Sequence, residues 1–333
     1  MIPRDGTMLR RLLAVLLLAA SPAGAEVPSL TVPVDCRIGE ECFVQNFVDR
    51  DPGPGARDYM CGALTYDGHA GTDFRVPDLA AMRRGVAVLA AAAGVVVGVR
   101  DGVDDVSIRA PGAPSVAGRE AGNMVAVDHG DGWLTQYSHL RKGSVAVHPG
   151  ERVAAGQRLG LIGLSGNTEF PHVDVAVRHN NQPVDPFVGP DAPPACGGGG
   201  TPLWNEAARQ ALAYRPTGVL NAGFAAETPN EAKARDGAYD AAAPGRDAPV
   251  LAFWAEIFGG QAGDRLELRI RGADGREIQR SSGVVPRPLA ALVVATAAKR
   301  PAAGWPPGVY RGQFSLTRNG AVAVDAERRV EIR

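Results

Sequence analysis

Hydrophobic and polar residues alternate with a period of two over many short segments of this chain, and glycine or proline separates the segments. This pattern predicts short β-strands that each bury one face. No long stretch has the period of a helix, so we expect a mainly β fold, a compact barrel or sandwich. The expected strands of its first part are 86–90, 94–99, 123–127, 133–137, 144–147, 159–163 and 171–177.

A second β region is expected at 217–333. Residues 264–271 alternate leucine or isoleucine with charged residues, and Asp274-Gly275 is typical of a hairpin turn. A second hairpin is expected where 309–317 and 321–332 meet across Asn319-Gly320. One apolar and one polar face per strand favours a small β-sandwich. This region has no histidine, so we assign it no chemistry; it either binds a partner or covers one side of the first β region.

The N-terminus has the features of an export signal. Three arginines precede the apolar run 12–20, and Ala23-Gly24-Ala25 is typical of a cleavage site. The run is short for a membrane anchor, so the pattern favours a signal peptide at 1–25 over a span. We therefore expect an exported protein, periplasmic or secreted, with no integral membrane segment after cleavage.

Glycine- and proline-containing stretches and changes in periodicity predict the domain boundaries. Residues 26–60 are expected to be an irregular lead-in segment, followed by the first β domain at 61–196. Four glycines then open a linker, 197–216, with a helix beginning at Thr201-Pro202 and ending near Tyr214. The insertion 101–122 lacks periodicity and is either a binding loop or a surface insertion.

Four cysteines remain after the predicted cleavage site, and an exported chain oxidises cysteines to disulfides. Four cysteines allow three pairings. We expect Cys36 to pair with Cys42 and Cys61 with Cys196; no CxxC pair supports a cysteine zinc site. A formal net charge of −1 gives no field that would attract nucleic acid.

Three motifs concentrate side chains that can bind a metal or move a proton. The first is His69-Ala70-Gly71-Thr72-Asp73, and the second is Tyr137-Ser138-His139-Leu140. In the third, Pro171-His172-Val173-Asp174, the period of a strand places His172 and Asp174 on one face.

The order of these motifs resembles the lysostaphin-type (LytM-like) zinc endopeptidases, which cut peptides of peptidoglycan. HxGxD, YxHL, VxPGxxVxxGQxLGxxGxSG, PHxxxxVR and VDP follow one another over residues 60–188. The resemblance implies a barrel or sandwich of the duplicated-hybrid-motif type that holds one Zn²⁺ per chain. Its implied activity is hydrolysis of peptide bonds in peptidoglycan stems or cross-bridges, so peptidoglycan peptides are the expected partner.

The same resemblance implies the site residues. It assigns His69, Asp73 and Asp174 as metal ligands, and His139 and His172 as the catalytic pair beside them. An exposed loop at His69 with Asp73 capping a turn is the alternative for the first motif. His129 and His148, which lie at turns, are interpreted as structural.

The third ligand departs from the family pattern, because Asp174 stands where the family has histidine. His179 is an odd number of positions away and cannot replace it from the same face of the strand. Two carboxylates cancel the charge of zinc, which predicts weaker catalysis with a more alkaline optimum. The alternative is a catalytically degenerate member that acts as a cell-wall binding or regulatory module, with a possible protein partner at the C-terminal domain. A biotin- or lipoyl-type carrier is disfavoured, because the only nearby lysine is Lys142.

Overall fold

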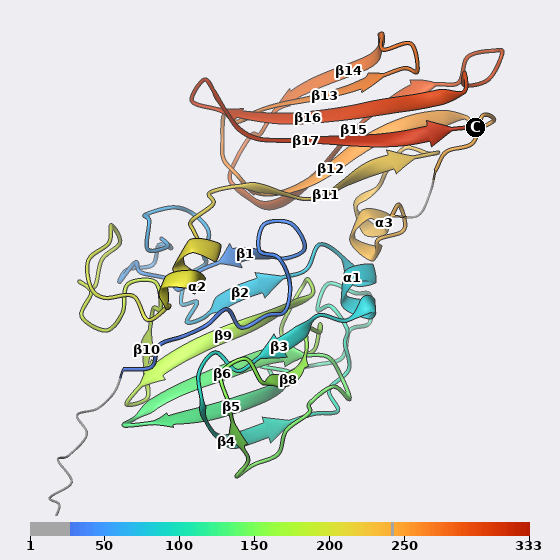
Figure 1. Cartoon of the computed structure of the whole chain (residues 1–333). Helices are drawn as coiled ribbons and strands as arrows, with labels where there is room; N and C mark the ends of the chain where they lie inside the picture. The colour runs from blue at the N-terminus through green and yellow to red at the C-terminus, as the bar shows by residue number, and fades with distance from the viewer. Residues whose placement is uncertain (1–26, 241–242) are drawn as a thin grey trace, which may run out of the picture.

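The computed structural model describes residues 27–240 and 243–333, and these residues form two lobes (Figure 1). We call residues 27–216 the N-terminal lobe and residues 217–333 the C-terminal lobe. Strands dominate both lobes, which confirms the mainly β prediction. The predicted signal peptide at 1–25 lies outside the described residues, and the predicted domain boundaries stay predictions.

The N-terminal lobe is built on an eight-stranded sheet. Its strand order is β1-β2-β9-β6-β5-β4-β7, with β10 paired to β9, and β3 and β8 form a second small sheet. The strands are β1 (Phe43–Asn46), β2 (Thr72–Arg75), β3 (Ala87–Leu89), β4 (Gly94–Arg100), β5 (Asn123–Gly130), β6 (Trp133–Leu140), β7 (Arg152–Val153), β8 (Arg158–Leu161), β9 (His172–His179) and β10 (Gln182–Val184).

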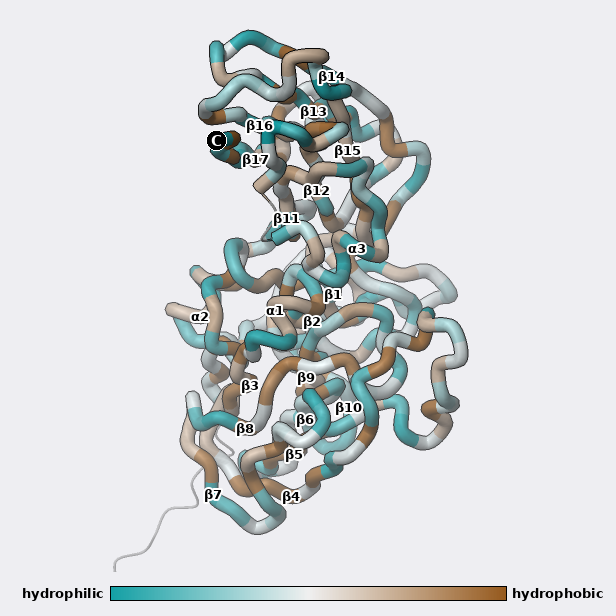
Figure 2. Tube along the Cα trace, turned by 90° about the vertical axis from the view of Figure 1, so that its right-hand side faces the viewer, coloured by the Kyte–Doolittle hydropathy of each residue, from teal (hydrophilic) through white to brown (hydrophobic). Residues whose placement is uncertain are grey.

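The core of this lobe follows from the alternation along the strands. Val173, Val175 and Val177 of β9 are fully or almost fully buried in one hydrophobic cluster. Since successive side chains of a strand point to opposite faces, His172 and Asp174 project from the other face, as the sequence predicted. Figure 2 shows hydrophobic, brown stretches along β4 and β9.

The C-terminal lobe consists of a three-stranded sheet, β11-β12-β15, and a four-stranded sheet, β14-β13-β16-β17. The two hairpins expected from the sequence are present, β13 with β14 and β16 with β17. Buried aromatic and aliphatic side chains of both sheets form one cluster, as in a sandwich. The strands are β11 (Gly218–Ala225), β12 (Val250–Gly260), β13 (Arg265–Arg271), β14 (Glu277–Val284), β15 (Leu289–Lys299), β16 (Gly308–Arg318) and β17 (Ala321–Ile332).

Three helices are present in the described residues, each of six residues: α1 (Leu79–Arg84), α2 (Glu206–Ala211) and α3 (Glu231–Asp236). The helix predicted to begin at Thr201-Pro202 and to end near Tyr214 begins later and is shorter. Asn205 caps α2 by accepting from Ala208 N (2.8 Å), whereas Trp204 is buried and bridges to Leu30 in an extended conformation. Burial of this tryptophan therefore delays the start of the helix.

Two further expectations about strands were wrong. The lead-in segment is not irregular throughout, because Phe43–Asn46 forms β1 and extends the main sheet beside β2. Residues 144–147 form no strand; the amide of Ala146 donates to Leu159 O (2.9 Å) without a ladder. The insertion 101–122 contains no regular element, as expected.

Both expected disulfides are confirmed. Cys36 bonds Cys42 within the lead-in segment, and Cys61 bonds Cys196 across 135 residues. The second bond ties the loop before the first histidine motif to the segment that follows the last strand of the N-terminal lobe. Within the described ranges, no helix has the length and apolar character that crossing a membrane requires.

Candidate metal centre

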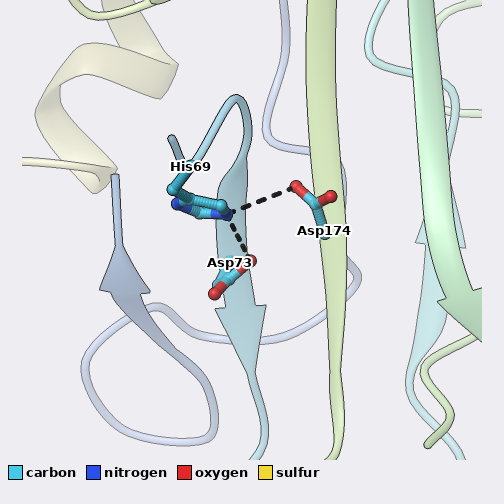
Figure 3. Close-up of side chains that lie close together, drawn as sticks. All are labelled: His69, Asp73 and Asp174. Carbon is cyan, nitrogen blue, oxygen red and sulfur yellow. Dashed lines mark ion pairs between the residues drawn. The ribbon is translucent and has the colours of Figure 1, made fainter. Parts of the chain in front are cut away.

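The first three candidate residues come together on two neighbouring strands. Asp73 of β2 and Asp174 of β9 are direct partners in the antiparallel register. His69 lies in the loop that precedes β2, and its ring points toward both carboxylates (Figure 3). Two carboxylates placed opposite each other repel unless a cation lies between them.

Three atoms converge at one point. His69 Nε2 lies 3.3 Å from Asp73 Oδ1 and 3.9 Å from Asp174 Oδ1. The ligand atoms of the three residues all lie within 4.8 Å of one another. Each of the three named atoms is buried and has no hydrogen-bond partner among the described residues. Buried polar atoms without partners are costly, so three that face one another favour a bound cation.

Hydrogen bonds to neighbouring groups orient His69 and Asp73, so that one ligand atom of each stays free. The Nδ1 of His69 lies 2.8 Å from the carbonyl of Phe47, and donation there leaves Nε2 with its lone pair. The second oxygen of Asp73 accepts from Asn46 Nδ2 at 2.7 Å, leaving Oδ1 free. Both supports come from β1 or the residue after it, in the segment that the sequence predicted to be irregular. No motif of the sequence indicated a role for Asn46.

The electrostatics of the trio also favour an added positive charge. Burial lowers the pKa of His69, but Asp73 and Asp174 raise it overall to about 9. Burial and the charge of Asp73 raise the pKa of Asp174 to about 6. The pKa of Asp73 stays well below its usual range, because His69 and His172 outweigh the effect of burial. Without a metal ion, the negative charge of the two carboxylates is balanced by protons that His69 and Asp174 hold more tightly than usual. A divalent cation would balance the same charge.

His139 and His172 lie beside the trio, as expected. Their ring centroids are 4.7 Å apart, and His172 Nε2 is 3.4 Å from Asp73 Oδ1. His139 Nδ1 lies 2.8 Å from Ser165 O, and His172 Nδ1 lies 2.9 Å from Phe170 O. Donation to these carbonyls directs both Nε2 atoms away from the backbone, where they can exchange protons with a substrate.

The two rings differ in protonation. Burial and the nearby His172 lower the pKa of His139 to about 3, so His139 is neutral. Burial lowers the pKa of His172 as well, but Asp73 raises it overall. Environments that push the pKa values of two neighbouring groups apart are typical of an acid and base pair. Without a metal ion, the two rings therefore differ in their tendency to bind a proton.

The donor set fits zinc. One imidazole nitrogen and two carboxylate oxygens are ligands that zinc accepts, and three protein ligands are the usual number at catalytic sites. A zinc ion bound there would supply Lewis acidity for a peptide carbonyl and for water. Gly71 permits this arrangement, because a Cβ at Gly71 would lie 1.7 Å from Asp174 Oδ1.

The other histidines lie outside the cluster. His129 contacts Ala93 O and Thr135 Oγ1, and His148 is exposed. His179 stacks on Trp133 with ring centroids 4.3 Å apart. His129 and His148 thus lie outside the cluster, and their interpretation as structural residues stays a prediction. His179 contacts Trp133 and does not join the cluster of Asp174.

Comparisons with known proteins bear on this segment. Residues 67–186 match the model of peptidase family M23. A stretch of 65 residues, 20% of this chain, is 38% identical to the peptidoglycan DD-endopeptidase ShyA of Vibrio cholerae and covers 15% of that protein. A stretch of 104 residues, 26% of this chain, is 33% identical to the cell division protein DipM of Caulobacter vibrioides and covers 17% of it.

Among solved structures, a zinc-containing peptidase from Vibrio cholerae is 25% identical; the match covers 43% of this chain and 39% of that one, with a TM-score of 0.28. The chain spans less than a fifth of the length of the two curated relatives. The family match agrees with the order of motifs in the sequence. Residues 67–186 are therefore a domain of peptidase family M23.

Proposed function

We propose that this protein is an exported zinc metalloendopeptidase that hydrolyses peptide bonds of peptidoglycan stems or cross-bridges. The observation that carries the proposal is the convergence of three buried, unpartnered ligand atoms from His69, Asp73 and Asp174 inside an M23 domain. A hydrolase of this class needs three ligands and a pair of proton-transferring groups, and the site offers both.

The roles of the side chains follow from their orientation. His139, with Nδ1 held against Ser165 O, directs Nε2 into the site and accepts a proton from the attacking water. His172, with Nδ1 held against Phe170 O, donates a hydrogen bond from Nε2 to the oxyanion that develops on the substrate carbonyl. Asp73 serves both parts of the site, because its Oδ1 lies within 3.4 Å of a nitrogen of His69 and of His172.

Similarity supports the substrate class. The relative from Vibrio cholerae that is 38% identical over 65 residues is named a peptidoglycan DD-endopeptidase, and residues 67–186 match the model of a peptidase family. Two disulfides support export, since such bonds persist in oxidising compartments. Location in the periplasm or outside the cell brings the enzyme to its polymer.

The test is digestion of purified sacculi by the mature protein, followed by mass spectrometry of the released peptides. We expect new products of peptide-bond hydrolysis, which disappear with a chelator and return with zinc. His139→Ala should lower the rate of hydrolysis at least about 100-fold, whereas His148→Ala should match the parent. Intact sacculi after digestion with the zinc-loaded parent would overturn the proposal.

A second candidate function rests on Asp174. A second carboxylate neutralises the charge of a divalent ion and weakens its action on water. The domain would then bind cell-wall peptides or regulate another hydrolase without cutting them. Sacculi that bind the protein but release no new peptide would favour this candidate.

A further inference from the structure

A cavity of about 490 Å³ lies between the two lobes and reaches the catalytic pair. Asp73, His139 and His172 are among the residues that line it. Its volume falls within the usual range of ligand pockets, so it can hold a short peptide.

The C-terminal lobe supplies one wall of this cavity. Two segments form the wall: residues 259–261 at the end of β12, and residues 288–290 at the start of β15. They are adjacent because Gly260 pairs with Leu289 in the sheet. The N-terminal lobe contributes Ile108, from the irregular insertion, and the segment 167–170 before β9 to the lining. The residues of the C-terminal wall are Gly259, Gly260, Gln261, Pro288, Leu289 and Ala290.

Buried contacts hold this wall against the N-terminal lobe. Phe258 and Leu220 of the C-terminal lobe belong to the hydrophobic core of the N-terminal lobe. Glu256 of β12, fully buried, lies 4.0 Å from the guanidinium of Arg75, two residues after Asp73. A core shared by two lobes opposes their relative motion, so the wall keeps its place beside the site.

A local ion pair fixes the turn that forms the wall. Arg318 pairs with Asp264 at 2.7 Å and donates to the carbonyl of Gly259 at 2.8 Å. The second contact of Asp264 is with the backbone amide of Gln261, at 2.7 Å. The backbone of the turn is thus held at both ends, and the side chain of Gln261 remains available to a ligand.

Few charged side chains line the cavity away from the catalytic pair. No lysine or arginine is among the described residues that line the cavity. Two carboxylates line it, Asp73 and Glu169, and Glu169 is paired with Arg109 at 2.7 Å. Within the described part of the chain, the side-chain amides of Asn167 and Gln261 have no hydrogen-bond partner, so they can bind a peptide backbone. Apolar side chains occupy much of the remaining surface.

We propose that the C-terminal lobe is a wall of the substrate groove, and that Leu289, Ala290 and Gln261 bind an uncharged stretch of the substrate peptide next to the scissile bond. The inference rests on the proposed function and adds to it a role for the second lobe. Truncation of that lobe would expose the shared core, so point variants are the suitable test.

The test uses Ala290→Trp, which adds an indole to an exposed position of the wall. Ala295→Trp is the matched control, because Ala295 is exposed on the same strand and does not line the cavity. Both are made in the full mature chain, in parallel with the parent. The probe is the mixture of soluble muropeptides that a muramidase releases from sacculi. Binding is measured by calorimetry in a His139→Ala background, and hydrolysis in the active background.

We expect Ala290→Trp to weaken binding of the muropeptides at least about 10-fold and to raise KM, with the zinc content and melting temperature of the parent. The control should bind and cleave like the parent. Parent-like binding by Ala290→Trp would overturn the inference while leaving the proposed function intact. A parent that neither binds nor cleaves muropeptides would overturn both.

Discussion

Replacing Gly71 by alanine should remove Asp174 from the metal site without unfolding the protein. A Cβ at Gly71 would lie 1.7 Å from Asp174 Oδ1 and 2.8 Å from Asp174 Cγ, where contacts below 3.0 Å essentially never occur. The backbone of Gly71 is not in the left-handed region, so alanine can adopt it. The carboxylate, whose side chain is 22% exposed, therefore has to move by at least about 1.3 Å to restore a separation of 3.0 Å.

A movement of this size exceeds the tolerance of metal–ligand distances, which is about 0.2 Å. Loss of supporting groups alone lowers metal affinity about 10- to 100-fold, so we expect at least about 100-fold for a displaced ligand, or about 2.8 kcal/mol. The assay is competition for zinc with a chromophoric chelator, with thermal unfolding as a check of the fold. Gly98→Ala is the control, since its nearest neighbour for a Cβ, Ala126, is 3.8 Å away.

A double-mutant cycle isolates the mechanism. If Gly71→Ala acts only through Asp174, it should have no further effect on zinc affinity in an Asp174→Ala background. Additive losses in the cycle, or parent-like affinity of Gly71→Ala, would refute the assignment of Asp174 as a ligand.

Two further variants test the charge of the site and a buried acid outside it. Asp174→His removes one carboxylate, so we expect faster hydrolysis at pH 7 and a lower pH optimum; an unchanged rate at pH 7 would argue against the charge argument. Burial raises the pKa of Asp185 from 3.8 to about 6, so the unfolded chain releases this proton first and stability falls as pH rises through 4 to 6. In Asp185→Asn, the loss of unfolding free energy between pH 4 and pH 7 should be smaller than in the parent by up to about 3 kcal/mol. The asparagine oxygen still accepts the hydrogen bond from Phe187 N. Urea denaturation at both pH values measures the effect, and an equal pH dependence in the two proteins would contradict the prediction.

Local periodicity was enough to predict the strand that carries the site. Valines at every second position of β9 fix which face is buried, and this places His172 and Asp174 on the opposite face. The hairpins with Asp-Gly and Asn-Gly turns could also be predicted from the sequence, because the residues that favour these turns are neighbours in the chain. Disulfide pairing also agreed with its prediction.

Features that depend on packing between residues far apart in the chain could not be predicted from the sequence. Phe43–Asn46 forms a strand only because the edge of β2 is available to it, and Asn46 thereby reaches Asp73. The extended conformation before α2 comes from burial of Trp204 against the N-terminal segment. No local pattern indicated that Glu256 lies beside Arg75, because 181 positions separate them and only the packing of the two lobes brings them together.

The central claim is that His69, Asp73 and Asp174 hold one zinc ion, and metal content tests it most directly. The chain without residues 1–25 is purified without added metal and analysed by inductively coupled plasma mass spectrometry beside an Asp174→Ala variant. We predict about one zinc per chain in the parent and a large loss in the variant, with both chains folded. A parent that contains no zinc and takes up none when it is supplied would contradict the account.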